Sequence, residues 1–297
     1  MSITLVAVVI ALVLGHVAPA LVTSARQFTW FGHWLQWLGT QSGEGGFWRG
    51  RHGIVLALLP VLAGVALLQW LLHAPLLGFL GLLFGVVALV YAWGPRDLDV
   101  DVEAIIDAHD APTRREAIAR LWPEGEGASI DGSALVEAVF RNALQRWFGV
   151  LFWFLLLGPV GALLYRLSAL ACEGEFARSL PAENLMGVRT LHSLLNWPVA
   201  QLMTLSMALV GNFDAVFNAW RTAQGNTLQL DVGFLGAAAR ASVKSELAEE
   251  AEEYAEEGMV QSMRELPELR DAMSLVWRIL LLWLAVLALF VIAGWVS

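Results

Sequence analysis

The sequence is poor in charged residues for its length. Only 15% of its 297 residues are charged, whereas 58% are hydrophobic, and the mean hydropathy is +0.62. A soluble domain averages about 25% charged residues, so this chain has too few charges to cover a water-facing surface. The composition therefore excludes an ordinary cytosolic enzyme and a disordered chain, and it predicts a membrane protein whose excess apolar residues face lipid.

Cysteine and lysine are almost absent as well. The single cysteine, Cys172, excludes an intrachain disulfide. The single lysine, Lys244, follows no glycine-rich loop, so a nucleotide-binding P-loop is missing and we expect no cofactor. A net charge of −9 and a pI near 5.1 argue against nucleic acid as a partner.

What the chain has in abundance is apolar stretches of about 20 residues, the length that crosses a bilayer. A stretch at 148–171 is broken by Gly158-Pro159, and another at 191–211 contains Pro198; these two span, re-enter or lie partly buried in protein. We expect an all-α, polytopic integral membrane protein with four to six membrane helices. The four uninterrupted stretches are residues 3–22, 54–72, 76–93 and 276–296.

Residues 26–52 are rich in Trp and Phe at helical spacing. This pattern predicts a helix at the membrane interface, and the alternative is an aromatic patch in a protein core. The expected organisation has five parts in chain order. Residues 1–93 hold three N-terminal spans, 94–147 form a cytoplasmic helical segment, and 148–213 form a core of broken helices. Residues 214–274 form an acidic cytoplasmic segment, and 275–297 form a C-terminal span.

The basic residues predict the orientation, because cytoplasmic loops carry an excess of Lys and Arg. Loops on the side of the two long polar segments hold fourteen Lys or Arg, and loops on the other side hold three. We therefore expect a multi-pass protein of the bacterial inner membrane, with both polar segments cytoplasmic and both termini external.

Acidic residues gather at two places without forming a recognisable metal site. Asp97 and Asp101 share one helix face and are weak candidates for metal ligands, but the glycine and glutamate of a calcium-binding loop are missing. A charged first turn of a helix is the alternative. The acidic run 246–257 is typical of a solvated helix.

The break at Gly158-Pro159 is the best candidate for a functional site. Pro159 has no backbone donor for the carbonyl of Leu155, and broken backbone at membrane depth is tolerated where it lines a cavity or packs within protein. Gly158 and Gly161 permit close approach of other groups. A simple proline kink is the competing interpretation.

Polar side chains near this break predict a ligand-binding pocket. Each costs about several kcal/mol in lipid unless it is paired, so we expect them to converge at the cytoplasmic face. Arg166 is the expected anion-binding or ion-pairing member, with Glu137 as its partner. The predicted site residues are Glu137, Asn142, Tyr165, Arg166, His192 and Asn196.

Two of these segments resemble a known superfamily. Residues 148–167 and 191–198 look like hallmark segments of the AmpE/CobD (CbiB) membrane superfamily, and residues 94–103 resemble the AmpE branch in particular. Gly158, Pro159, Gly161 and Trp197 fall in these segments and are expected to be structural. The resemblance is concentrated in residues 94–220.

The two branches imply different functions. CobD-type proteins are synthases that join an aminopropanol unit to a corrinoid carboxylate, whereas AmpE proteins are inner-membrane regulators linked to β-lactamase induction and peptidoglycan recycling. Several synthase residues, many of them acidic, are replaced in this chain, which should disable chemistry at a phosphate, metal or amine site. The replacing residues are Arg141, Gln145, Ala169 to Cys172, His192, Ser193 and Gln201.

We therefore expect an AmpE-type regulator, whose partners are the lipid bilayer and a cell-wall-derived small molecule or another membrane protein. The replaced acids argue against enzymatic activity, but the sequence leaves open whether any catalysis is retained. A CobD-like corrinoid synthase and a small transporter are the alternatives. A transporter would be expected to carry inverted repeats, and the sequence has no internal repeat.

Overall fold

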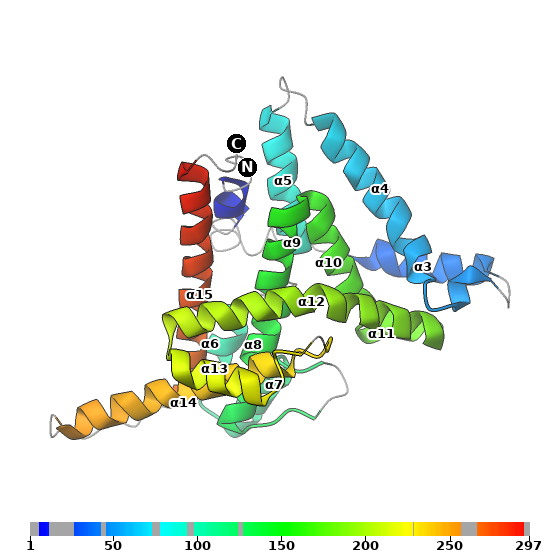
Figure 1. The fold of residues 1–297 in the computed structure, drawn as a ribbon. Coiled ribbons are helices and arrows are strands. Elements are labelled where there is room, and N and C mark those ends of the chain that lie inside the picture. The colour runs from blue at the N-terminus through cyan, green and yellow to red at the C-terminus, as the bar shows by residue number, and fades with distance from the viewer. Residues whose placement is uncertain are drawn as a thin grey trace. The chain divides into compact units, whose positions relative to one another are not determined.

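The structure is a computed structural model that describes residues 6–11, 27–42, 46–72, 78–93, 98–123, 127–227, 229–256 and 266–293. Within these ranges the regular elements are helices and no strand occurs (Figure 1). The all-α prediction is confirmed. The chain divides into two compact units, the first made of residues 1–95, 149–195 and 287–297, and the second of 96–148 and 196–286.

Three helices in the described part of the chain are long and apolar enough to cross a membrane: α4 (Ile54–Leu72), α12 (Ala182–Val210) and α15 (Pro267–Ile292). Two more, α5 (Gly78–Ala92) and α10 (Pro159–Ala171), are apolar but shorter. Only 17% of the apolar window of α4 and 22% of that of α15 is buried, as expected for helices that face lipid, whereas half of the apolar window of α12 is buried in protein. Of the stretch predicted at 3–22, only the helical residues 6–11 are described.

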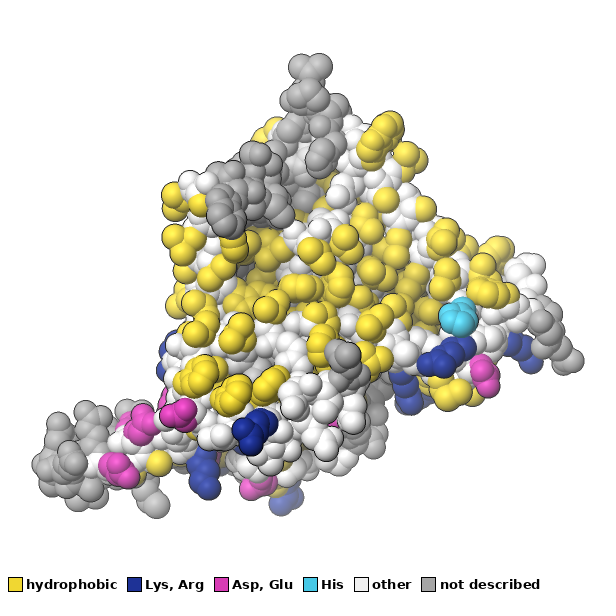
Figure 2. All heavy atoms as spheres, in the orientation of Figure 1, with side chains coloured by type: hydrophobic (Ala, Val, Ile, Leu, Met, Phe, Trp, Pro, Cys, Tyr) yellow, Lys and Arg dark blue, Asp and Glu magenta, His cyan; other side chains and the backbone are white. Residues whose placement is uncertain are grey.

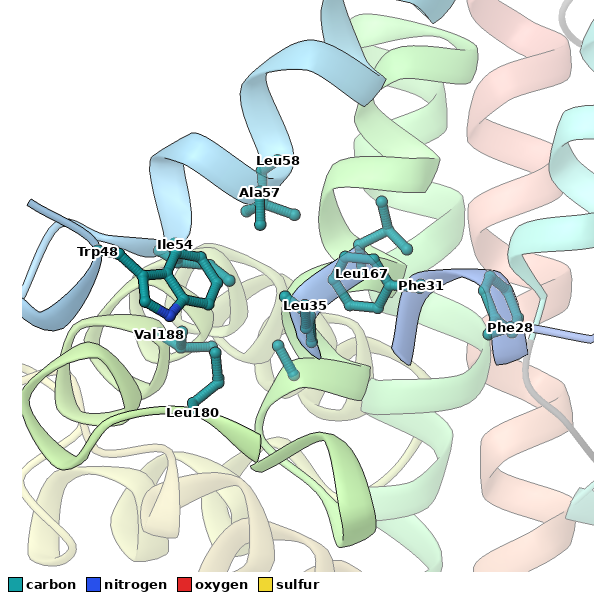
Figure 3. Close-up of a cluster of buried hydrophobic side chains, with 11 residues drawn as sticks. Phe28, Phe31, Leu35, Trp48, Ile54, Ala57, Leu58, Leu167, Leu180 and Val188 are labelled. Carbon is teal, nitrogen blue, oxygen red and sulfur yellow. The ribbon is translucent and has the colours of Figure 1, made fainter. Parts of the chain in front are cut away.

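The first unit also contains α3 (Thr29–Gln41), η1 (Phe47–Arg49), α9 (Gly149–Leu157) and α11 (Gly174–Ser179). Helix α10 packs on α4, α5 and α9, and α11 packs on α3. The hydrophobic core of the unit is shown in Figure 3. It consists of Phe28, Phe31, Leu35, Trp48, Ile54, Ala57, Leu58, Leu167, Ala171, Leu180 and Val188.

Helix α3 combines the two interpretations of the aromatic segment. Phe31 and Leu35 are fully buried in the core, while Trp30 and Trp37 on the other side are exposed. Trp34 stacks on Trp37 with ring centroids 5.1 Å apart and donates to the carbonyl of Ala57 at 3.1 Å. One face is therefore an aromatic core patch, and the opposite face offers the tryptophans typical of a membrane interface.

The apolar stretch at 148–171 folds back on itself instead of running as one helix. Gly158 has φ +68°, a conformation that favours glycine, and Pro159 begins α10. A Cβ at Gly149 would lie 2.0 Å from the ring of Tyr165, and one at Gly161 would lie 2.0 Å from the carbonyl oxygen of Trp153. These two pairings run in opposite directions along the chain, so α9 and α10 form an antiparallel hairpin.

A polar side chain of α4 covers the turn of this hairpin. The amide of Gln69 donates to the carbonyl of Leu157 and accepts from the backbone N–H of Val160, both at 3.5 Å. Backbone groups released by a helix break need partners where water is scarce. Gln69 supplies them from within an otherwise apolar helix, so the break is built into the fold and is more than a simple proline kink.

The second unit comprises α6 (Leu98–Ile106), α7 (Ala111–Ala119), α8 (Gly132–Ala143), the π-helical turn η3 (Leu144–Phe148), α13 (Phe213–Thr222), α14 (Gly233–Glu256) and parts of α12 and α15. Helix α8 packs on α6 and α14, and α13 packs on α14. Asp110, Asp131 and Asn212 cap α7, α8 and α13 by accepting from backbone N–H groups. Figure 2 shows acidic side chains over α14 and hydrophobic ones over α4.

We predict that Gly161→Ala destabilises the hairpin, because the added methyl group meets the backbone of Trp153 and backbone atoms yield little. Overpacking of this kind costs about 1–3 kcal/mol, so the melting temperature in detergent should fall. Gly64→Ala on α4 is the matched control, since a Cβ there meets nothing within 4 Å. Equal melting temperatures for the two variants would contradict the close packing of α9 on α10.

Candidate functional site

Polar side chains gather inside the apolar first unit. Tyr165, Arg166 and Ser168 lie on α10, His192 lies on α12, and all four are at least nine-tenths buried. The rings of Tyr165 and His192 are 5.4 Å apart between centroids. We call these four residues the α10–α12 polar cluster. The sequence predicted three of them, and Ser168 is an addition by the structure.

Ser168 connects the two helices of this cluster. Its Oγ donates to the carbonyl oxygen of Tyr165 at 2.7 Å and lies 3.3 Å from Nδ1 of His192. A hydroxyl group has one proton to donate, and Ser168 donates it to the carbonyl oxygen of Tyr165. The oxygen of Ser168 therefore accepts from Nδ1–H of His192, and this network assigns the unprotonated position of the neutral imidazole to Nε2.

His192 Nε2 is buried and has no hydrogen-bond partner among the described residues. A buried acceptor that lacks a donor typically costs about 1–3 kcal/mol. Its neighbour Arg166 is held differently, with the guanidinium carbon 5.7 Å from the ring centroid of Phe28, which is within cation–π range. The cluster thus holds a buried cation beside a buried acceptor.

Glu137 has a partner within the second unit that the sequence did not suggest. Its carboxylate, on α8, forms an ion pair with Arg240 of α14, and the predicted pair with Arg166 of the first unit stays a prediction. Both side chains are close to half exposed, so the pair contributes about 0–1 kcal/mol. The partner was missed because it lies 103 residues further along the chain.

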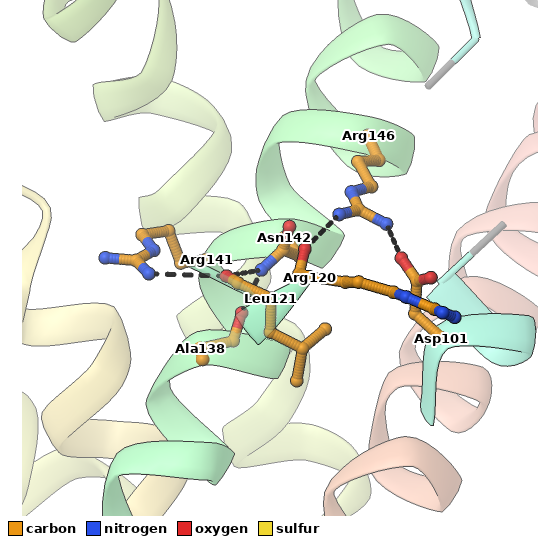
Figure 4. A network of polar contacts seen from close by, with 7 residues as sticks. All are labelled: Asp101, Arg120, Leu121, Ala138, Arg141, Asn142 and Arg146. Carbon is orange, nitrogen blue, oxygen red and sulfur yellow. Dashed lines mark hydrogen bonds and ion pairs between the residues drawn. The ribbon is translucent and has the colours of Figure 1, made fainter. Parts of the chain in front are cut away.

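Asn142 joins two helices through backbone carbonyl groups. Its side-chain nitrogen donates to the carbonyl oxygens of Leu121 and Ala138, each at 2.8 Å (Figure 4). Arg141 reaches the same carbonyl of Leu121 at 3.5 Å. The amide of Asn142 therefore fixes the chain after α7 against α8, a structural role that uses both of its donor protons.

Asn196 is buried on α12, four residues after His192. This spacing places the two side chains on the same face of the helix. Glu137, Asn142 and Asn196 belong to the second unit, whereas Tyr165, Arg166 and His192 belong to the first. The convergence of all six residues on one pocket stays a prediction.

Asp101, a weak candidate for metal binding, is neutralised by an arginine. Its carboxylate lies 2.6 Å from the guanidinium of Arg146, and the two side chains are 2% and 12% exposed. Arg146 also donates to the carbonyl of Arg120 at 3.3 Å (Figure 4). Asp97 lies outside the described residues, within which no group of three His, Cys, Asp or Glu side chains is arranged for a metal ion.

The acidic run of α14 is only partly solvated. Glu246 forms an ion pair with Arg278 of α15 at 2.6 Å. This pair borders a cavity of about 550 Å³ in the second unit. The cavity is lined by Val210, Gly211, Asn212, Glu246, Glu249, Glu250 and Arg278.

Comparison with known proteins identifies the family. Residues 4–276 match the family model described as CobD/Cbib protein. The chain belongs to the CobD/CbiB family. This result agrees with the superfamily suggested by residues 148–167 and 191–198, and it covers most of the chain, well beyond those two segments.

Two curated relatives give the CobD/CbiB assignment more detail. The chain is 32% identical over 183 residues to the cobalamin biosynthesis protein CobD of Stutzerimonas stutzeri (strain A1501), which covers 59% of each protein. It is 30% identical over 183 residues to the protein of the same name from Chromobacterium violaceum, covering 59% of this chain and 58% of that one. The chain thus spans about three fifths of the length of these relatives. No solved structure matches.

The expected AmpE-type regulatory function is wrong, because these CobD/CbiB relatives are named for cobalamin biosynthesis. The error came from reading replaced residues as lost chemistry. Gln201 accepts from Trp220 Nε1 at 3.0 Å and donates to the carbonyl of Gly225 at 2.7 Å, and Arg141 bonds backbone as described above. These two replacements are held in structural hydrogen bonds, so their identity by itself does not exclude the chemistry of the family.

We predict that Arg146→Met strongly destabilises the second unit, because it leaves the carboxylate of Asp101 buried without its counter-charge. Removing one partner of a buried ion pair costs about 3–5 kcal/mol. Glu103→Gln changes an exposed acid of the same helix and is the control. Chemical unfolding in detergent, followed by circular dichroism, measures both variants, and wild-type stability for Arg146→Met would contradict the assignment.

Proposed function

We propose that this chain acts in cobalamin biosynthesis as a membrane-bound CobD-type synthase, which joins an aminopropanol unit to a corrinoid carboxyl group in a condensation that forms an amide bond and releases water overall. The observation that carries the proposal is the family match over residues 4–276. The two relatives named cobalamin biosynthesis protein CobD support it. The α10–α12 polar cluster supports it from the structural side.

The chemistry of that cluster suits such substrates. Polar groups buried in an apolar membrane unit indicate function, because they are expensive to keep there. The guanidinium of Arg166 can bind a phosphate or carboxylate, for which its fork of N–H donors is well shaped. His192 Nε2 can accept from a hydroxyl or amine. One small substrate that carries an anion and a donor group could contact both residues.

The two polar segments, 94–147 and 214–274, are proposed to lie together in the cytoplasm, as the basic residues suggest. Their shared side is supported by the packing of α8 on α14 within the second unit. Because α9 and α10 are antiparallel, the end of α10 also lies on the same side of the hairpin as the start of α9. The bilayer is the proposed partner of the exposed apolar surfaces of α4 and α15.

The function is tested by complementation. In a bacterium that lacks its own CobD and is grown without added cobalamin, the full-length chain should restore cobalamin-dependent growth. Arg166→Ala should reduce this by at least about tenfold if one charge-assisted contact is lost, whereas Arg115→Ala on the exposed surface of α7 should not.

The Stutzerimonas stutzeri relative serves as the positive control in the same strain. If that protein restores growth and this chain does not, although it is inserted in the membrane at equal amounts, the proposed function is refuted. Membrane levels of each variant are compared by immunoblot, so that loss of the protein is separated from loss of activity.

The orientation is tested by labelling single cysteines in a Cys172→Ser background. Arg115→Cys on α7 and Lys244→Cys on α14 both introduce exposed thiols. We expect a membrane-impermeant maleimide to label them only after the cells are permeabilised. Labelling of both positions in intact cells would reverse the orientation, and labelling of one alone would contradict their shared side.

A further inference from the structure

We propose that His192 binds the amino-alcohol substrate through Nε2, and that Ser168 positions the imidazole for this by accepting from Nδ1–H. The inference rests on the proposed function and adds to it a specific binding atom and a positioning residue. The ligand chemistry is a hydrogen-bond donor, either the hydroxyl or the uncharged amine of a short amino alcohol.

The first step of the argument is the direction of each hydrogen bond. The carbonyl of Tyr165 can only accept, so the hydroxyl of Ser168 donates to it at 2.7 Å. The same oxygen is then free to accept from Nδ1–H of His192 at 3.3 Å. This arrangement fixes the tautomer of His192. The hydrogen bond from Nδ1–H keeps the single ring proton on Nδ1 and leaves Nε2 as an acceptor.

The second step concerns the burial of His192. Its side chain is 7% exposed, and Nε2 meets no donor within the described part of the chain. The other histidines whose side chains are described, His33, His52 and His109, are all exposed. A histidine that served only to fill the core would be expected to have both nitrogens satisfied, so the open acceptor points to a ligand that supplies a donor.

The third step is what surrounds the imidazole. The ring of Tyr165 packs near it at 5.4 Å, and Ser168 is fully buried on the same helix turn. Tyr165 is itself fixed against Gly149 in the hairpin, where a side chain would collide with its ring. The acceptor is therefore held by packed neighbours on a rigid hairpin, which is the preorganisation that binding of a small ligand requires.

The direct test uses the full chain in lipid nanodiscs, labelled with ¹⁵N-histidine. We expect the His192 signals of the Nδ1–H tautomer, with an unprotonated Nε2, and these signals are assigned by their loss in His192→Gln. Adding 1-aminopropan-2-ol should shift the Nε2 resonance upfield, because the lone pair then accepts a hydrogen bond. Parallel titrations with 2-propanol and isopropylamine distinguish the hydroxyl from the amine as the donor.

Ser168 is tested as a positioning residue. Ser168→Ala should mix the two tautomers of His192 and weaken binding of the amino alcohol by about tenfold, the loss of one hydrogen bond. Ser168→Thr keeps the hydroxyl and should restore both the tautomer and the affinity. His33→Gln, at an exposed position of α3, is the matched control and should leave the titration unchanged.

The outcomes separate this inference from the proposed function. If the wild-type chain restores growth but its Nε2 signal ignores the amino alcohol, or if His192→Phe restores growth fully, the binding role is refuted and the function stands. If the resonance shifts but the chain does not complement, the binding site stands and the synthase function fails. An Nε2–H tautomer in the free protein would overturn the role of Ser168.

Discussion

The contact of α9 with α10 is the constraint on which the first unit depends. Two glycines, Gly149 and Gly161, let the helices approach so closely that neither position has room for a methyl group, and the positive φ of Gly158 turns the chain between them. Close approach at small residues replaces the hydrophobic effect as the driving force where lipid is the solvent. Once α10 is fixed in this way, Tyr165 and Ser168 are directed toward His192, and Arg166 lies over Phe28.

The second unit also buries several polar groups near apolar helices. The carboxylate of Asp101 is neutralised by Arg146, and Asn142 bonds to backbone carbonyl groups. Each of these polar groups is paired within the unit, as expected where burial without a partner is expensive. His192 Nε2 in the first unit contrasts with them, because it is buried and open. That contrast is the ground for the binding role proposed for His192.

The replaced synthase residues show why a branch assignment from single positions fails. Arg141 and Gln201 are departures from the synthase pattern, yet each has a backbone partner that explains it. A side chain that stabilises the fold can change without changing the chemistry, and a fold can host more than one function. The superfamily was therefore recognisable from the glycine–proline segment, whereas the regulatory function inferred from missing acids was contradicted by the relatives.

The sequence by itself determined the fold class, the apolar stretches 54–72 and 276–296, the break at Gly158-Pro159 and the polar character of Tyr165, Arg166 and His192. Composition and periodicity act locally, so these features need no partner elsewhere in the chain. Only the tertiary structure decided that Ser168 bonds to His192 and that Glu137 pairs with Arg240. These pairs are 24 and 103 residues apart, and the choice among many possible polar partners depends on how the helices pack, which no local pattern encodes.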